Sequence, residues 1–139
     1  MTARVLASFA LTLFALSAQT QQTFKARLSP VPIDAQLAPV ITGHGAASAV
    51  LAGSKLTVSG TFEGMRSNAT VAQLHESKTT GVPGSTIYVL TVSPAAAGSL
   101  SGSVDLTPSQ VQALRKGLLY IVICSTGAPD GNLWGWLLK

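Results

Sequence analysis

The chain has 139 residues, with nine lysines and arginines against five aspartates and glutamates, for a formal net charge of +4. A chain of this length accommodates one domain. Its cations are scattered and form no basic stripe interleaved with aromatic residues, which argues against a nucleic-acid-binding protein.

The N-terminus has the pattern of a secretory signal peptide. Four residues with one positive charge precede VLASFALTLFAL, a run of twelve residues without a charge. A membrane-spanning helix needs about 20 apolar residues, so this run is too short to be one. Small residues after it favour cleavage behind Ser17 or Ala18. We therefore predict a signal peptide at 1–18 and a secreted or periplasmic domain at 19–139, with no transmembrane segment after cleavage. The alternative is an uncleaved N-terminal membrane anchor.

Short strands are expected to follow one another along the mature chain. Residues 55–64 (KLTVSGTFEG) alternate apolar and polar side chains, the pattern of a half-buried strand, and Gly53-Ser54 before them predicts a two-residue hairpin turn. Residues 30–39 hold three prolines and are expected to form a loop or an edge segment. The strands predicted from such patterns are 23–29, the second half of 43–53, 55–64, 69–75, 85–93, 99–106, 118–124 and 133–139.

One helix is expected near residues 107–116. Thr107 is its N-cap, Pro108 takes the first helical position, and Gln110 completes a capping box. Behind the helix, LLYIVIC (118–124) is a continuous apolar run, which predicts a strand buried on both faces. Together these elements predict a mainly β fold, an antiparallel β-sandwich or barrel of about eight short strands with one short helix.

Cys124 is the only cysteine, so no disulfide can form within the chain and stability must come from packing. Three interpretations of the thiol stay open. It is buried and inert, it pairs with a second chain, or it binds a ligand.

Two segments carry a family resemblance. Residues 106–120 read LTPSQVQALRKGLLY and residues 129–135 read PDGNLWG. In this order, after TFKARLS, the A-x-L-H strand and the VPG loop, the chain resembles the chordin-type (CHRD) domain family. The resemblance covers residues 24–139. It implies a secreted, β-rich domain without a general enzymatic activity. We therefore expect no enzyme, but a structural or interaction module of the envelope or extracellular space, whose partner is an unknown protein or an extracellular polymer.

The same resemblance marks a candidate site. The family pattern is similar to A-H-I-H on the middle strand and Y-V-N-I-H-T on the late one, and a glutamate follows in the closing segment. Here Gln73 and Cys124 stand where the family has histidines, Asn132 stands for the glutamate, and only His75 is unchanged. The hypothesis is therefore either no cofactor or a copper or zinc ion.

Strand geometry gives the metal hypothesis its form. Gln73 and His75 are two residues apart on a strand, so they share a face. If the two strands lie side by side, His75 and Cys124 would meet and bind a soft ion such as Cu(I), with Gln73 or His44 as a further ligand. The other interpretation is that His75 hydrogen-bonds a loop, Cys124 is a small buried hydrophobe, and His44 is an exposed loop residue.

Other residues leave further alternatives. Trp134 and Trp136 flank a glycine and share one strand face, where they form either a binding platform or a cap on the core. Asn68 begins an Asn-Ala-Thr sequon, which is also explained as a turn. Glu76 and Asp130 are single carboxylates without a partner at acid–base spacing, and we interpret them as solvated loop residues.

Overall fold

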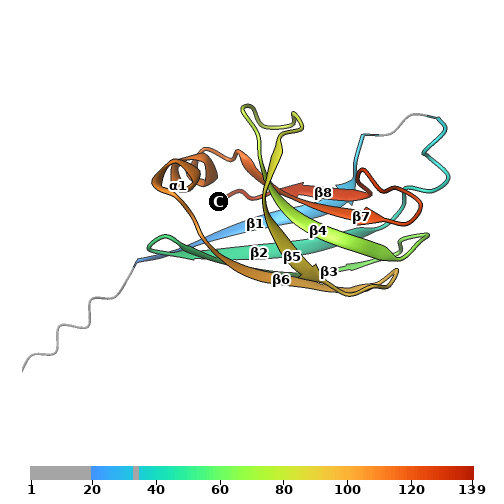
Figure 1. The fold of residues 1–139 in the computed structure, drawn as a ribbon, viewed down its shortest axis with the longest axis horizontal. Coiled ribbons are helices and arrows are strands. Elements are labelled where there is room, and N and C mark those ends of the chain that lie inside the picture. The colour runs from blue at the N-terminus through green and yellow to red at the C-terminus, as the bar shows by residue number, and fades with distance from the viewer. Residues whose placement is uncertain (1–19, 33–34) are drawn as a thin grey trace, which may run out of the picture.

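The structure is a computed structural model that describes residues 20–32 and 35–139, so the predicted signal peptide lies outside the described residues. Figure 1 shows the elements in this part of the chain. They are β1 (Gln21–Pro30), β2 (His44–Ala52), β3 (Lys55–Glu63), β4 (Ala69–Glu76), β5 (Ser85–Val92), β6 (Gly98–Asp105), α1 (Pro108–Arg115), β7 (Leu119–Ser125) and β8 (Leu133–Trp136). The predicted class, mainly β with one short helix, is confirmed.

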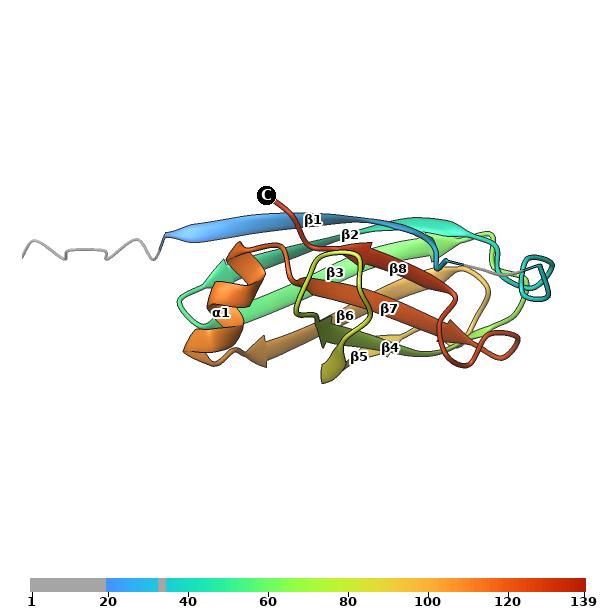
Figure 2. The ribbon, with the colours of Figure 1, turned by 90° about the horizontal axis from the view of Figure 1, so that it is seen from above.

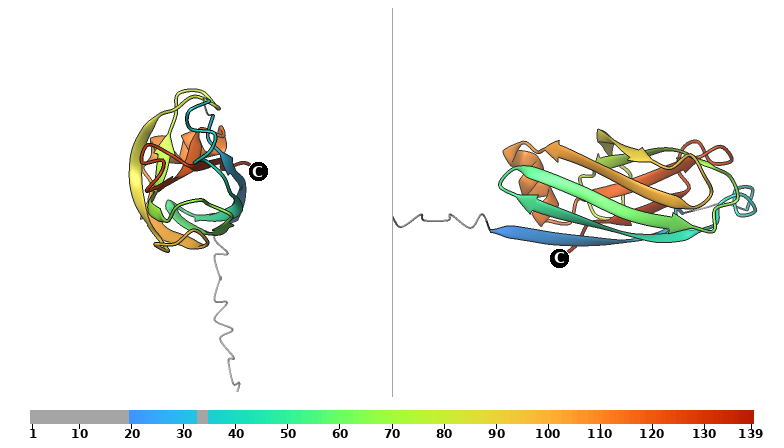
Figure 3. Two further views of the ribbon diagram at one scale, coloured as in Figure 1. Left: turned by 90° about the vertical axis from the view of Figure 1, so that its right-hand side faces the viewer. Right: turned by 90° about the horizontal axis from the view of Figure 1, so that it is seen from below.

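The strands form a closed antiparallel barrel in the order β1-β2-β3-β6-β5-β4-β7-β8. Viewed along its long axis, the barrel is a ring of strands (Figure 3, left). The barrel closes where β8 pairs with β1, at Ser29–Trp134 and Pro30–Leu133. The pairing of β5 with β6 is equally short, at Thr91–Ser101 and Val92–Leu100.

Alternation along the strands builds one core inside the barrel. In β3, Leu56, Val58 and Phe62 point inward and are buried, as the sequence predicted. At the end where β1 begins, α1 lies across the strands (Figures 1 and 2) and adds buried Val111 and Leu114 to the same core. The predicted capping box is confirmed: the Thr107 side chain accepts from the Gln110 amide, and the Gln110 side chain accepts from the Thr107 amide. No helix among the described residues is long and apolar enough to cross a bilayer.

β7 is buried on both faces, as its apolar run predicts. Its inner side chains, Leu119, Ile121 and Ile123, belong to the barrel core. Its outer side chains, Tyr120, Val122 and Cys124, belong to a second cluster on the outside of the barrel, which Trp134, Trp136 and Val71 help to cover. Because of this second cluster, the outer surface around β7 carries buried apolar and aromatic side chains.

Two predicted strand limits were wrong. The second strand includes all of His44–Ala52, so His44 begins β2 and is not a loop residue. The last strand ends at Trp136, although Leu138 still bridges Lys25 in the register of the β1–β8 pairing. The ladder is interrupted where Gly135 approaches the backbone of β1: a Cβ there would lie 2.6 Å from the Arg27 carbonyl oxygen.

Candidate functional site

The outer face of β4, β7 and β8 carries two rows of side chains that cross the three strands. In the first row, His75 is opposite Tyr120, which is opposite Trp136. In the second row, Gln73 is opposite Val122, which is opposite Trp134. We call these six residues the aromatic face. Alternation fixes their outward direction, since their strand neighbours point into the barrel core.

Tyr120 is the centre of the aromatic face. Its ring centroid lies 4.4 Å from that of Trp136, 5.8 Å from that of Trp134 and 5.1 Å from that of His75. The two tryptophan rings are 5.7 Å apart and tilted by 67°. Tyr120 is only 2% exposed, whereas both tryptophans are half-buried. The face is therefore a packed aromatic cluster whose outermost members reach solvent.

Hydrogen bonds join the aromatic face to the loop between β4 and β5. The Gly84 amide donates to the Tyr120 hydroxyl over 2.6 Å, and that hydroxyl lies 3.3 Å from His75 Nδ1. His75 Nε2 is 2.8 Å from Gln73 Oε1 and 3.1 Å from the Thr86 hydroxyl. With the Gln73 carbonyl oxygen as acceptor, Nε2 carries a proton, and a neutral ring then accepts from the Tyr120 hydroxyl at Nδ1. This arrangement fits a neutral imidazole.

Burial supports the neutral form of His75. Desolvation lowers the pKa of His75 below its ordinary 6.5, and a backbone hydrogen bond to Gly84 opposes part of that effect. Cys124 is shifted in the opposite direction: burial raises the pKa of its thiol, and the negative charge of Asp130 adds to the effect. Neither group is held in its charged form, so the face offers neither an imidazolium nor a thiolate.

The structure does not bring His75 and Cys124 together. Cys124 is opposite Val71, four residues along β7 from the residue opposite His75. At about 3.3 Å per residue, four residues along the strand correspond to a separation of about 13 Å. His44 is on β2, beyond β3, β6 and β5 in the barrel, and its ring pairs with Glu63 at 2.9 Å. Among the predicted ligands, only Gln73 contacts His75, and the described residues contain no group of three metal-ligating side chains. The metal hypothesis required His75 and Cys124 to meet, and the geometry places them apart.

Asn132 has a structural role, because its hydrogen bonds join neighbouring segments. Its side chain is fully buried, accepts from the Ser125 hydroxyl at 2.9 Å and donates to the Thr42 carbonyl at 2.9 Å. Its backbone carbonyl accepts from the Val31 amide at 3.1 Å. The residue thus ties the segments before β2 and before β8 to the end of β7, beside the aromatic face.

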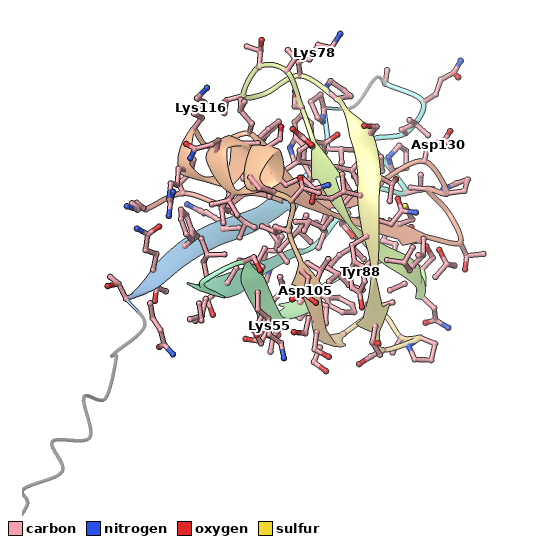
Figure 4. All side chains as sticks on the ribbon, turned by 60° about the vertical axis from the view of Figure 1, so that its left-hand side comes forward. Lys55, Lys78, Tyr88, Asp105, Lys116 and Asp130 are labelled. Carbon is pink, nitrogen blue, oxygen red and sulfur yellow. The ribbon has the colours of Figure 1, made fainter. Side chains whose placement is uncertain are left out.

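A groove of about 330 Å³ opens beside the aromatic face. Tyr120, Val122 and Trp134 form part of its wall, and Asp130 is the only charged residue in its lining. The other lining residues are Val31, Pro32, Gly81 and Pro83. Asp130 lies at the surface, on the loop before β8, and Lys78 lies on the loop between β4 and β5 (Figure 4). The predicted platform, Trp134 and Trp136, lies on the outside of the barrel. Its strand is not an edge strand, because β8 pairs with both β1 and β7.

Sequence analysis missed Tyr120, Thr86 and the part that Asp130 takes in the groove. The signal for Tyr120 was present, because period-two alternation puts it on the same face as Cys124. Thr86 and Asp130 carry no local signal: their positions depend on which strands and loops become neighbours.

These observations define a small β-barrel domain with one aromatic outer face, a groove beside it, and a buried thiol in the same outer cluster. The model of the CHRD domain matches residues 14–137, so the chain belongs to the CHRD domain family. No curated protein and no solved structure matches the chain significantly.

Proposed function

We propose that this chain is an exported, non-enzymatic interaction domain that binds a partner in the envelope or extracellular space through the aromatic face and its groove. The observation that carries the proposal is the pair of half-buried tryptophans packed against Tyr120 on the outer surface. Large aromatic side chains that keep part of their surface in solvent are typical of binding surfaces, because they bury much area with little loss of side-chain freedom.

The candidate residues support binding better than catalysis. His75 is engaged on both ring nitrogens, and its pKa is lowered by burial. Cys124 is 5% exposed, and its pKa is raised by the same cause. A catalytic base or nucleophile needs a free lone pair within reach of a substrate. A copper or zinc function would need ligands that this geometry keeps apart.

A photo-crosslinking experiment in the producing cell tests the proposal. The crosslinking amino acid replaces Val82, a residue 50% exposed on the loop beside the groove, and in a matched variant it replaces Ser59 on the opposite side of the barrel. We expect a discrete adduct from position 82 in the envelope or extracellular fraction, and none from position 59. The N-terminus of the same protein should begin at Ala18 or Gln19. Equal adducts at both positions, no adduct at position 82, or a cytoplasmic chain with its leader intact would reject the proposal.

A further inference from the structure

The groove beside the aromatic face combines an apolar wall with a single negative charge. Its lining includes Val31, Pro32 and Pro83 from two loops, the rings of Tyr120 and Trp134, and the carboxylate residue Asp130. Within residues 20–32 and 35–139, the only ion pair joins His44 and Glu63, so no cation of this part of the chain neutralises Asp130. The charge of Asp130 also helps to raise the pKa of the Cys124 thiol in the same outer cluster. A ligand that complements this groove is therefore cationic and has an apolar stem.

The polar groups of the groove limit the ligand further. The Tyr120 hydroxyl is already engaged by the Gly84 amide and by His75 Nδ1. Among the side chains of the lining, Asp130 is thus the acceptor left for a ligand. A sugar ring presents several hydroxyl groups and needs several partners, which this lining does not supply. A single cationic group suits this lining better, because it needs only one strong charge-assisted hydrogen bond and can lie over an aromatic ring.

We propose that the groove takes an arginine side chain from an extended segment of the protein partner. This inference rests on the proposed function and names the chemistry of its partner. The guanidinium is planar, so it stacks on the Trp134 ring and still presents a fork of donors to the Asp130 carboxylate. Its aliphatic stem lies along Val31 and Val122, which line the same groove.

The groove is large enough to take one arginine side chain. About 330 Å³ is at the small end of ligand sites, which span roughly 300–1,000 Å³. The neighbouring loop presents Val82, which is 50% exposed, as additional apolar surface for the peptide on either side of the arginine. The partner segment therefore needs an accessible arginine with small or apolar neighbours.

Intrinsic fluorescence gives a direct measurement, because both tryptophans of the chain, Trp134 and Trp136, lie on the aromatic face. The purified protein is titrated with a blocked Gly-Ser-Arg-Ser-Gly peptide and with two peptides that carry citrulline or lysine in place of arginine. Citrulline keeps the shape of arginine but has no charge. We expect saturable binding of the arginine peptide with a dissociation constant on the order of 1 mM. The citrulline peptide should bind at least ~10-fold more weakly, and the lysine peptide ~3-fold or more, because lysine lacks the planar fork.

Two variants with the same change in net charge complete the test. Asp130→Asn should weaken the arginine peptide ~5-fold or more, whereas Asp105→Asn, on β6 and well away from the groove (Figure 4), should leave it unchanged. Equal binding of arginine and citrulline peptides, equal binding of arginine and lysine peptides, or an unaffected Asp130→Asn variant would overturn the arginine assignment.

The same data separate this inference from the function on which it rests. If no peptide binds while the crosslink at position 82 persists, the arginine assignment is wrong and the interaction domain stands. If both the peptide signal and the crosslink are absent, both are wrong.

Discussion

The two sides of the barrel present opposite surfaces. On the outer face of β1, β2, β3 and β6, mostly short side chains form rows in register, one of which runs from Lys25 to Ser48, Ser59 and Ser101. We call this the hydroxyl face. It has an open hollow of about 780 Å³, more than twice the volume of the groove. None of the four side chains in the row makes a hydrogen bond or ion pair within the described residues.

The difference shows that hollow volume and binding potential are separate properties. The hydroxyl face is wide because its side chains are short, but its hollow is lined by no aromatic ring that could anchor a partner. The aromatic face has a smaller groove but holds three large rings and a connected set of hydrogen bonds. These properties are the basis for proposing the aromatic face as the binding surface, and the following predictions test whether the two faces differ.

The largest expected difference comes from truncating the centre of each face. Tyr120→Ala removes a side chain that is 2% exposed, and we expect a loss of about 3–5 kcal/mol in the free energy of unfolding, as for other buried aromatic residues. Ser59→Ala, at an exposed position, should change it by less than about 0.5 kcal/mol. Urea unfolding followed by circular dichroism measures both. If Tyr120→Ala does not fold, Tyr120→Leu provides the comparison. Similar losses in the free energy of unfolding at the two positions would contradict this prediction.

A smaller effect is expected from removing only the Tyr120 hydroxyl. Tyr120→Phe keeps the ring contacts but leaves His75 Nδ1 and the Gly84 amide without their partner, at an expected cost of about 1–2 kcal/mol. A double-mutant cycle with His75→Ala isolates the contribution of the His75–Tyr120 pair, and a coupling of about 0.5–1 kcal/mol is expected. A coupling near zero would mean that the two side chains are neighbours without a bond between them.

Much of the fold could be predicted because its signals are local. The hairpin at Gly53, the capping box at Thr107 and the apolar run of β7 each depend on residues close in sequence, and all three agree with the structure. Closure of the barrel could not be predicted in the same way. It depends on β1 and β8, from the two ends of the domain, pairing through only a few residues.

The site illustrates the same limit. Period-two alternation put Gln73 and His75 on one face of their strand, and the two side chains do contact each other. Alternation does not fix register, and any shift by an even number of residues preserves the face while changing every partner. The register of β4 on β7 puts Tyr120 opposite His75 and Cys124 opposite Val71. This register keeps His75 away from Cys124, so the predicted metal pair does not form. The same register brings the side chains of the aromatic face together.

A pH dependence is the next smaller effect. Because the pKa of His75 is lower in the folded chain than its ordinary 6.5, folding favours the neutral ring. Its contribution to stability is complete above about pH 6.5 and is lost as the pH falls through the folded-state pKa. His75→Gln should flatten the stability profile below pH 6.5, and His44→Gln is the matched control. The ring keeps some exposure, so the effect should be smaller than that of Tyr120→Phe. A folded-state pKa above 6.5, measured by NMR titration of the His75 ring protons, would reverse the sign of this prediction.

The smallest expected effect concerns the position of the Asp130 carboxylate relative to Cys124 and the groove. Burial accounts for most of the rise in the pKa of the Cys124 thiol, and the Asp130 charge adds to it. Labelling by iodoacetamide should be slow in the folded protein and fast in urea, because Cys124 is 5% exposed. Asp130→Asn should shift the pH profile of the slow native reaction toward lower pH, whereas Asp105→Asn should not. The shift requires the Asp130 carboxylate to lie close enough for its field to reach β7, which is also the condition for it to face a cation in the groove. An unchanged profile would place that carboxylate away from the groove and would remove the charge on which the arginine assignment depends.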